Sequence, residues 1–375
     1  MHRVGVIGGG QLARMMHPAA IALGIELKVF AEQEHSSAHQ AATKIGDYTD
    51  YRQLQEFAKT VDVVTFDHEH VPVALLEQLE AEGLKVYPGP KSLIFAQNKA
   101  LMRRRLAELG LPLPAWQTAS DAAAIEAFIA IHGPEIIVKT PVGGYDGKGV
   151  RVVSDSQQVS DWLDQIEKLG GELLLEEKVP FVRELAQLVA RNPSGDLATY
   201  EVVQTVQKNG VCAEVIAPAP KPVDSIAARK IAEEIAVGLN VVGMMAVELF
   251  ETADGHLVIN ELAMRPHNSG HYSIEGTATS QFEQHLRAVL DLPLGSTELL
   301  APAAVMVNLL GVDDRNTFTE HYSKAMSVDA ALKFHSYEKS ARVGRKMGHI
   351  TALGDHPAEL LKKAHSAAAA IYNQI

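Results

Sequence analysis

Residues 136–153 read IIVKTPVGGYDGKGVRVV, and this stretch decides the fold class of the chain. Segments 136–140 and 150–153 predict the strands of a hairpin, joined by a loop at 143–149 that holds four glycines. Lys139 can place a positive charge on nucleotide phosphates, and the glycines let the backbone approach polyphosphate oxygens without a Cβ clash. The loop lacks the G-K-[ST] ending of a Walker loop. A glycine-rich turn could merely join two strands, but a solvated turn needs neither four glycines nor a strand-end lysine, so a nucleotide-binding hairpin is predicted.

Residues 1–90 have the pattern of a parallel, Rossmann-like α/β unit. Strands and helices are expected in alternation at 3–7, 11–23, 26–30, 51–58, 61–66 and 73–82. The run Gly8-Gly9-Gly10 follows the first strand and could present backbone N–H groups to a phosphate. A dinucleotide fingerprint would need glycine at Ala13, and Glu32 meets its acidic position only loosely. A tight turn without a ligand therefore stays an alternative to a phosphate site.

The rest of the chain predicts helices and mainly antiparallel strands. Helices are expected at 92–109, 225–237, 280–290 and 357–372. Strands are expected at 173–176, 185–191, 210–216, 304–309, 331–334 and 348–352, with a hairpin at 244–260. The pattern therefore indicates an α/β unit followed by α+β structure.

The composition favours a globular protein that acts on small molecules. The chain has 375 residues, of which 47% are hydrophobic, and a formal net charge of −12. This charge argues against a broad basic surface for nucleic acid or anionic lipid, although a local phosphate pocket remains possible. Cys212 is the one cysteine, which excludes a disulfide within the chain and a cysteine-based zinc site. Its apolar neighbours predict an inert strand thiol.

The sequence also predicts a soluble, cytoplasmic protein. Residues 1–10 predict a strand and a glycine turn rather than a secretory signal. No uninterrupted apolar run reaches the about 18 residues needed to cross a bilayer. A single cysteine fits a reducing compartment.

Two glutamates lie on strands that are expected to be neighbours. Glu248 lies in AVELF and Glu261 ends the segment VINE, and a turn at Asp254-Gly255 would join the two strands. Facing acids would be costly in a core unless a cation lay between them. Carboxylate oxygens suit Mg²⁺, which is normally completed by waters and substrate phosphates. Exposed sheet glutamates are the alternative, but apolar neighbours such as Val247 and Ile259 favour the magnesium site.

A polar cluster follows directly and reads RPHNSGH at 265–271. The planar guanidinium of Arg265 suits a carboxylate or carbonate oxyanion, and imidazole exchanges protons near neutral pH. His267 and His271 could instead ligate a metal, but their i, i+4 spacing would require a helix, which Pro266 and Gly270 oppose. The cluster therefore predicts an oxyanion site.

Taken in chain order, these features resemble the ATP-grasp superfamily, and the resemblance covers nearly the whole chain. The residues that carry it are Lys99, Lys139, the loop at 143–149, EEKVPF at 176–181 with Glu184, Glu248, and Asn260-Glu261. More narrowly, several segments resemble the 5-(carboxyamino)imidazole ribonucleotide synthetases of purine biosynthesis. These segments are GGGQL at 8–12, GYDGKG at 144–149, RPHNSGH at 265–271 and SQFE at 280–283.

The resemblance implies an ATP-grasp fold in four parts. They are a Rossmann-like N-terminal domain at 1–95, a linker helix with a glycine-loop lid at 96–175, an antiparallel ATP-binding domain at 176–300 and a small β-rich C-terminal domain at 301–375. It also implies a homodimer.

The resemblance further implies how ATP and Mg²⁺ are held. Lys99 and Lys139 would hold the phosphates. The loop would close over them through Gly144, Tyr145, Asp146, Gly147, Lys148, Gly149 and Val150. Adenine would lie along Glu176, Glu177, Lys178 and Val179, and Glu184 would take the ribose hydroxyls. Glu248 and Glu261 would bind Mg²⁺, with Asn260 beside the nucleotide.

The implied reaction uses ATP to join bicarbonate to aminoimidazole ribonucleotide. Bicarbonate would attack the γ-phosphate to give carboxyphosphate, and the amine of the ribonucleotide would then be carboxylated to a carbamate. Arg265, His267 and Asn268 would form the bicarbonate pocket, and Lys148 would be a further catalytic residue from the loop. The residues expected on the ribonucleotide are Gly10, Gln11, Leu12, Glu69, Tyr145, Arg345 and Lys346. A solvated basic turn is the alternative for the last two.

The sequence departs from the family pattern at several places. Asp67 stands where the family more often has glutamate, and residues 204–207 replace a segment that usually carries an asparagine and a histidine. Ala263 replaces a metal-binding asparagine of many ATP-grasp enzymes, so only two protein ligands to the metal are predicted.

Other functions remain open from the residues alone. A formate-dependent glycinamide ribonucleotide transformylase shares the Arg-Pro-His motif but not the Gly-Tyr-Asp-Gly loop. A nicotinamide-dependent oxidoreductase would use the N-terminal glycines. A regulatory module would bind ATP without chemistry.

Overall fold

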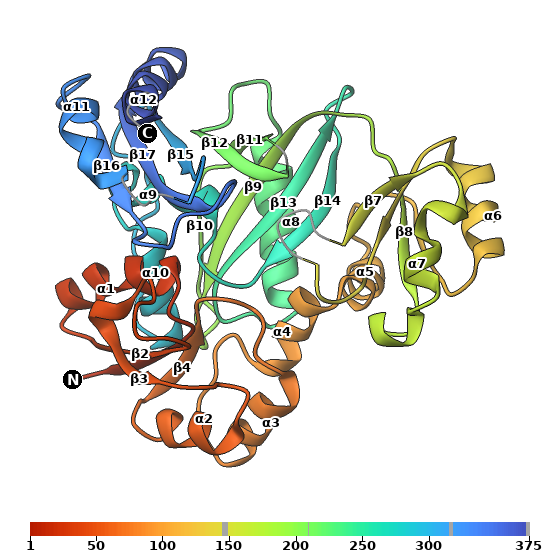
Figure 1. The fold of residues 1–375 in the computed structure, drawn as a ribbon, viewed down its shortest axis with the longest axis horizontal. Helices are drawn as coiled ribbons and strands as arrows, with labels where there is room; N and C mark the ends of the chain where they lie inside the picture. The colour runs from red at the N-terminus through yellow and green to blue at the C-terminus, as the bar shows by residue number, and fades with distance from the viewer. Residues whose placement is uncertain (145–148, 209, 315–317, 373–375) are drawn as a thin grey trace.

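The computed structural model describes residues 1–375 except 145–148, 209, 315–317 and 373–375. Figure 1 shows a red-to-orange N-terminal unit, a small yellow unit to one side, and a large green-to-blue body. The described strands form three sheets, of four, nine and four strands. In the described part of the chain, no helix is long and apolar enough to span a membrane.

The N-terminal sheet is parallel, with strand order β3-β2-β1-β4. Its elements are β1 (Arg3–Ile7), α1 (Gln11–Leu23), β2 (Glu26–Ala31), β3 (Ala42–Ile45), α2 (Tyr51–Ala58), β4 (Val63–Phe66) and α3 (Val73–Ala81). The α1 helix buries Leu12, Met16 and Ala20 along one face, which is the period expected for a helix on a sheet. The predicted parallel unit is confirmed. β3 could not be predicted, because its four residues, ATKI, stay at least partly exposed and carry little apolar pattern.

The predicted helix at 92–109 is wrong as a single element, because the chain breaks at Asn98. The structure has α4 (Pro90–Gln97) and α5 (Lys99–Glu108). Asn98 adopts an extended conformation, with φ of −131° and ψ of 105°, and its Oδ1 accepts a hydrogen bond from the Leu101 N–H at 3.0 Å. An asparagine in this position caps the helix that follows. The break therefore places Lys99 in the first turn of α5.

A small antiparallel sheet, which we call the lid sheet, has the order β5-β8-β6-β7. Its strands are β5 (Trp116–Ala119), β6 (Ile136–Lys139), β7 (Val150–Val153) and β8 (Leu173–Glu177), and α6 (Ala122–His132) packs against it. The predicted hairpin is confirmed, with Ile136 opposite Val153 and Lys139 opposite Val150. β5 and α6 were not predicted from the sequence.

The large sheet is antiparallel at every pairing of its strands. It runs β14-β13-β9-β11-β12-β15-β17-β16, and β10 pairs with β9. Its strands are β9 (Phe181–Arg191), β10 (Leu197–Thr199), β11 (Val203–Lys208), β12 (Val211–Ala217), β13 (Gly243–Thr252), β14 (Leu257–Ala263), β15 (Ala303–Leu310), β16 (Lys333–Ser336) and β17 (Lys346–Gly354). Because β12 pairs with β15, one sheet continues across the predicted domain boundary at residue 300. The division into four domains stays a prediction.

Side chains on the large sheet alternate between two faces, which fixes the side on which a site can form. Val247 lies opposite Gln187 and belongs to the core that α8 (Ser225–Gly238) covers. Glu248 lies opposite Ala186 and so points to the other face. α10 (Gln281–Val289) packs on part of that second face, and α12 (Pro357–Tyr372) covers β15 and β17.

The remaining helices are short and connect these layers. They are α7 (Ser160–Leu163), α9 (Ser273–Gly276), α11 (Tyr322–Met326) and the 3₁₀ turns η1 (His39–Ala41), η2 (Ser156–Val159), η3 (Ile166–Leu169), η4 (Asn268–Gly270) and η5 (Phe318–His321).

Candidate active site

The two predicted metal-binding acids face each other on neighbouring strands. Glu248 on β13 lies opposite Glu261 on β14, next to an irregularity in the register. Their side chains keep exposed fractions of 29% and 43%, so a ligand can reach both. Burial, together with the charges of Glu261 and Glu184, raises the pKa of Glu248 to about 7. Two acids held this close suit a cation, because one of them otherwise gives up its charge.

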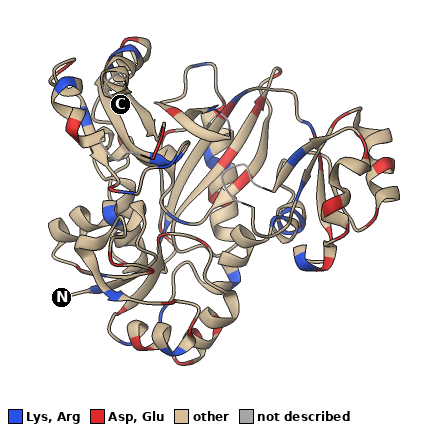
Figure 2. Ribbon diagram, in the orientation of Figure 1, with Lys and Arg blue, Asp and Glu red and all other residues tan. Residues whose placement is uncertain are grey.

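Lysines from two other elements reach the same place. Lys99 at the start of α5 donates to Glu261, and Lys139 at the end of β6 donates to the Asn260 side-chain oxygen at 3.2 Å. Burial alone would raise the pKa of Glu261, but the charges of Lys99 and Lys139 lower it. Figure 2 shows acidic stretches on the central strands and basic stretches on α5. The predicted convergence of both lysines on the acids is therefore present in the structure.

Glu176 lies at the centre of a buried ion cluster rather than facing solvent. Its Oε2 lies 2.7 Å from the Lys139 Nζ, and its Oε1 accepts a hydrogen bond from Arg103 Nε. Although burial opposes it, the charges of Arg103 and Lys139 lower the pKa of Glu176 to about 2. Burial also lowers the pKa of Lys139 in spite of its acidic neighbour. Glu176 thus stays ionised across the physiological range.

Arg103 is a further member of this site that was not predicted from the sequence. Its side chain is fully buried, and its Nη2 donates to the Asn260 carbonyl oxygen at 2.6 Å. In the sequence it is one of three consecutive arginines, 103–105, and looks like part of a solvated basic face. One signal could have found it, because Arg103 follows Lys99 by four residues and so lies on the same side of the helix.

The polar loop at 265–271 borders the acids. The His267 Nε2 lies 3.3 Å from the Glu248 Oε1, and its Nδ1 lies 2.9 Å from the Ser269 hydroxyl. Burial, assisted by the charges of Arg265 and Lys346, lowers the pKa of His267 well below its ordinary value. A neutral imidazole beside a carboxyl whose pKa is near 7 can share one proton with it.

Arg265 is held by a residue of the N-terminal domain. The Glu69 Oε2 lies 3.2 Å from the Arg265 Nε, and the Glu69 Oε1 accepts a hydrogen bond from the Met264 N–H at 2.5 Å. This brings β14 and the loop after β4 together. Glu69 was predicted to contact the ribonucleotide, and the structure brings it to Arg265, the residue predicted to hold bicarbonate. Its contact with a substrate stays a prediction.

Asn268 and His271 are buried and engaged with protein partners. The Asn268 Oδ1 accepts a hydrogen bond from the Asn308 Nδ2 at 2.6 Å. The two ring nitrogens of His271 lie 3.2 Å from the Gln11 Nε2 and 2.9 Å from the Gln281 Nε2. The metal alternative for His267 and His271 therefore finds no support. Among the described residues, no group of three or more histidine, cysteine, aspartate or glutamate side chains could hold a metal.

Comparisons with known proteins agree over the whole chain. Residues 1–97 match the ribonucleotide synthetase preATP-grasp domain, residues 104–282 the ATP-grasp domain, and residues 304–363 the phosphoribosylaminoimidazole carboxylase C-terminal domain. An N5-carboxyaminoimidazole ribonucleotide synthase of Mycobacterium tuberculosis is 48% identical, over 97% of this chain and 86% of that protein. The chain belongs to this synthase family.

Other members of the synthase family give the same picture. The synthase of Corynebacterium ammoniagenes is 43% identical, over 99% of this chain and 92% of that protein. A solved synthetase in complex with ADP superposes with a TM-score of 0.88 at 36% identity, over 100% of this chain and 97% of that one. The Aspergillus clavatus enzyme, solved with ADP and 5-aminoimidazole ribonucleotide, gives 0.88 at 30% identity, over 99% of each chain. The predicted ATP-grasp fold and ligase class are therefore confirmed.

In this member of the synthase family, the N-terminal glycine turn packs tightly on Asp67. The Asp67 Oδ1 accepts a hydrogen bond from the Ala13 N–H at 2.8 Å, within the first turn of α1. A Cβ added to Gly10 would lie 1.9 Å from the Asp67 Oδ2. Gly10 is thus required for this close approach. The Gln11 Oε1 accepts a hydrogen bond from Lys339 at 2.7 Å, and Leu12 lies in the core.

Glu32 is the acidic residue that a nicotinamide-dependent oxidoreductase would use, and in this structure it is bound by other groups of the protein. The Glu32 Oε2 accepts a hydrogen bond from the Gly9 N–H at 3.2 Å, and its Oε1 lies 3.1 Å from the His68 Nε2. The hydrogen bond from His68 is the main reason that the pKa of Glu32 falls to about 2. Family membership excludes this alternative, and the glycine turn belongs to the synthase fold.

The other predicted nucleotide residues that the structure describes lie in the loop between β6 and β7, at the start of β7, at the end of β8, between β8 and β9, and on β9. Gly149 has a φ of 74°, and its carbonyl oxygen accepts a hydrogen bond from the Thr140 N–H at 2.9 Å. The Glu177 Oε1 accepts from the Ala115 N–H at 2.9 Å, and Lys178 pairs with Glu135 at 2.6 Å. Gly144 and Val179 are partly exposed, Val150 is exposed, and burial raises the pKa of the half-buried Glu184. Tyr145, Asp146, Gly147 and Lys148 lie outside the described residues.

Residues of the C-terminal strands approach the site from a third direction. Lys346 begins β17, and its charge acts on Glu248 and His267. Arg345 donates to the Ser340 hydroxyl at 2.7 Å, and burial lowers its pKa. Cys212 is buried on β12, which raises the pKa of its thiol to about 12, as expected for the predicted inert thiol.

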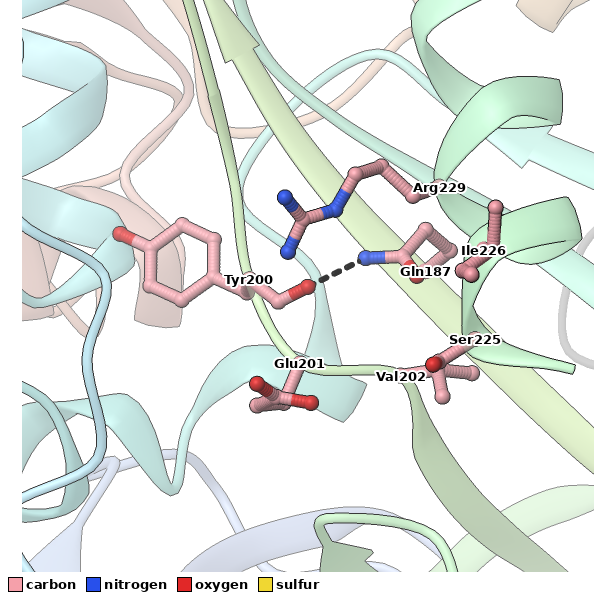
Figure 3. A pocket seen from close by; sticks show the side chains of 7 residues that line it. All are labelled: Gln187, Tyr200, Glu201, Val202, Ser225, Ile226 and Arg229. Carbon is pink, nitrogen blue, oxygen red and sulfur yellow. Dashed lines mark hydrogen bonds between the residues drawn. The ribbon is translucent and has the colours of Figure 1, made fainter. Parts of the chain in front are cut away.

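A cavity of about 440 Å³ lies elsewhere, between β9, the chain leading to β11, and α8 (Figure 3). Its lining is Gln187, Tyr200, Glu201, Val202, Ser225, Ile226 and Arg229. The buried Gln187 donates to the Tyr200 carbonyl oxygen at 2.6 Å, as the dashed line shows. Gln187 belongs to the α8 face of the sheet, so this cavity is separate from the acids on the other face.

Proposed function

We propose that this chain carboxylates 5-aminoimidazole ribonucleotide, with ATP and bicarbonate as co-substrates and with carboxyphosphate as the intermediate. The observation that carries the proposal is the 3.3 Å contact between His267 and Glu248. It joins the predicted bicarbonate loop to the predicted metal acids. A γ-phosphate at the acids would therefore lie beside a bicarbonate at Arg265, as an in-line transfer requires.

The residues of the site fit Mg²⁺ and a triphosphate. Glu248 and Glu261 would hold the metal, since their mutual repulsion is what raises the Glu248 pKa after burial. Held by these two carboxylates, Mg²⁺ would supply the positive charge that stabilises the γ-phosphoryl group during its transfer. Lys99 and Lys139 would supply two further positive charges, and both are already directed to this region by Glu261, Asn260 and Glu176.

The proposed chemistry has two bond exchanges. A bicarbonate oxygen held by Arg265 forms a bond to the γ-phosphorus, and the bond to the β–γ bridging oxygen breaks, so ADP leaves. The amine nitrogen then forms a bond to the carboxyl carbon, the bond to phosphate breaks, and the nitrogen loses a proton. A neutral His267 offers a lone pair close to these groups and would take up this proton.

The ribonucleotide would lie between the N-terminal turn and the C-terminal strands. Gly10 and Gln11, with Arg345 and Lys346, are proposed to contact its phosphate and ribose. The link from Gln11 to His271 at 3.2 Å supports this location, because it joins the glycine turn to the bicarbonate loop. We further propose that the protein is cytoplasmic and forms a homodimer. Light scattering of the purified chain would test whether it is a dimer.

The deciding experiment is ADP release with 5-aminoimidazole ribonucleotide, measured with and without bicarbonate. We expect release to depend on both, and ¹³C-labelled bicarbonate to enter the ribonucleotide as a carbamate. Formate with glycinamide ribonucleotide is the matched control. ADP release that depends on formate, or that is equal with and without bicarbonate, would contradict the proposal.

A further inference from the structure

Glu176 has two cationic partners, and they lie on different elements of the fold. Arg103 binds its Oε1 from α5, and Lys139 binds its Oε2 from β6 at 2.7 Å. The side chains of Arg103, Lys139 and Glu176 have exposed fractions of 0%, 9% and 4%. Removing one charge from such a cluster leaves another without compensation, which is strongly unfavourable.

The predicted role of Lys139 requires it to change partners. A lysine that contacts a nucleotide phosphate withdraws at least part of its charge from Glu176. The carboxylate would then stay buried with a single partner, so that partner must be permanently charged. Arginine is protonated throughout the accessible pH range, and its planar fork can bind two acceptors at once.

Arg103 meets these requirements by its contacts on both sides. Its Nε donates to Glu176 on the lid sheet, and its Nη2 donates to the Asn260 carbonyl oxygen on β14 at 2.6 Å. The Asn260 side chain in turn accepts from Lys139 at 3.2 Å. Arg103 therefore contacts Glu176 and Asn260, the two residues that hold Lys139. Among the described contacts, Arg103 and Lys139 share no hydrogen bond with each other.

We propose that Arg103 is a positioning residue, which stays on Glu176 and so lets Lys139 exchange that carboxylate for a nucleotide phosphate. This inference rests on the proposed nucleotide site. Without Arg103, an ionised Glu176 would hold Lys139 as its one cationic partner and would compete with the phosphates for it. The same variant would compete less at low pH, because a buried carboxyl that loses its partner takes up a proton more readily.

The test is ATP affinity measured by calorimetry, which needs no turnover. Arg103→Met should weaken ATP binding by about tenfold, the effect of one charged contact. Adding Glu176→Gln to Arg103→Met should restore most of this loss, because the competing charge is gone. The loss should also be smaller near about pH 6 than near about pH 8. The matched control is Arg104→Met, since Arg104 on the same helix pairs with Glu172 at 2.5 Å and stays 41% exposed.

Two results would overturn the proposal. One is an Arg103→Met protein that binds ATP as tightly as Arg104→Met. The other is a weakened protein that Glu176→Gln does not restore at any pH, because that outcome means a purely structural role. If Arg103→Met does not fold, Arg103→Lys takes its place. Its ATP affinity is measured with and without Glu176→Gln, and the second change should again restore most of the loss. Wild-type protein that binds ATP but does not carboxylate the ribonucleotide would contradict the proposed function and leave this test valid.

Discussion

The Glu69 carboxylate lies 3.2 Å from the Arg265 Nε, so the N-terminal domain fixes the guanidinium that we assign to bicarbonate. A loop after β4 thereby sets the position of a residue that follows β14. The two domains contribute to one site through this pair of side chains.

Glu69→Gln should reduce the use of bicarbonate without affecting ATP binding. The amide keeps the shape of the side chain but removes the charge that orients Arg265, so we expect the KM for bicarbonate to rise by about tenfold. Steady-state ADP release at varied bicarbonate measures this, and calorimetry measures ATP affinity. Glu77→Gln, at an exposed carboxylate of the same domain, is the control. Equal losses in both affinities would count against a role centred on Arg265.

Arg265→Ala should give a larger effect of the same kind. Loss of the oxyanion donor is expected to lower bicarbonate-dependent turnover by about 100-fold or more, with ATP affinity nearly unchanged. Arg287→Ala, on the α10 helix, is a suitable comparison because its ion pair with Glu283 is local to that helix. Unchanged kinetics in Arg265→Ala would move the oxyanion site to another residue.

Glu261→Ala should abolish phosphate release while the protein stays folded. The change removes one predicted metal ligand and the partner of Lys99, so we expect turnover to fall by about 1,000-fold or more. Phosphate release and a circular dichroism melting curve check both halves of the prediction. Full activity in a folded variant would refute the metal assignment.

The Glu248 pKa of about 7 predicts a pH-dependent affinity for Mg²⁺. Because this carboxyl is protonated below that pKa, the metal must displace a proton there, and the apparent affinity should rise as the pH increases through 7. Calorimetry in buffers of different ionisation enthalpy should detect proton release on metal binding. Glu248→Gln should show neither proton release nor this pH dependence.

The same shift has a consequence for stability in metal-free buffer. The folded protein binds a proton at Glu248 more tightly than the unfolded chain does, since the pKa rises from 4.5 to about 7. This contribution to stability is therefore complete below about pH 4.5 and is lost as the pH rises to 7. The difference in melting temperature between wild type and Glu248→Gln should change in this window. A constant difference would contradict the shift.

Gly10→Ala should destabilise the N-terminal domain. Its Cβ would lie 1.9 Å from the Asp67 Oδ2, and Asp67 cannot turn away without releasing the Ala13 N–H. We expect a loss of about 1–3 kcal/mol in the free energy of unfolding, with a higher KM for the ribonucleotide. Chemical denaturation measures the first effect. The control is Lys85→Ala, at an exposed position of the same domain.

Much of the site could be predicted because its residues lie on elements with strong local patterns. The facing of Glu248 and Glu261 follows from an alternating apolar pattern and one turn, which together fix a hairpin. Lys139 could be identified as a phosphate-binding candidate because it lies at the end of a short β-rich strand. These features depend on local sequence alone.

The rest depends on tertiary contacts that no local pattern records. Arg103 is buried because Glu176 and Asn260, which are distant in sequence, meet at α5. The pairing of Glu69 with Arg265 joins residues 196 positions apart. β11 was missed because its residues VQTVQK are largely polar, and the neighbouring strands β9 and β12 stabilise it.

The continuous large sheet limits how the protein could be divided. Ending the chain at residue 300 would remove β15 and leave the backbone of 214–217 on β12 without its neighbour. A newly bared sheet edge of this kind invites pairing with other chains. A fragment that ends at residue 300, the predicted end of the ATP-binding domain, would therefore tend to aggregate. It would do so even though it keeps both predicted metal-binding acids and both predicted phosphate-binding lysines.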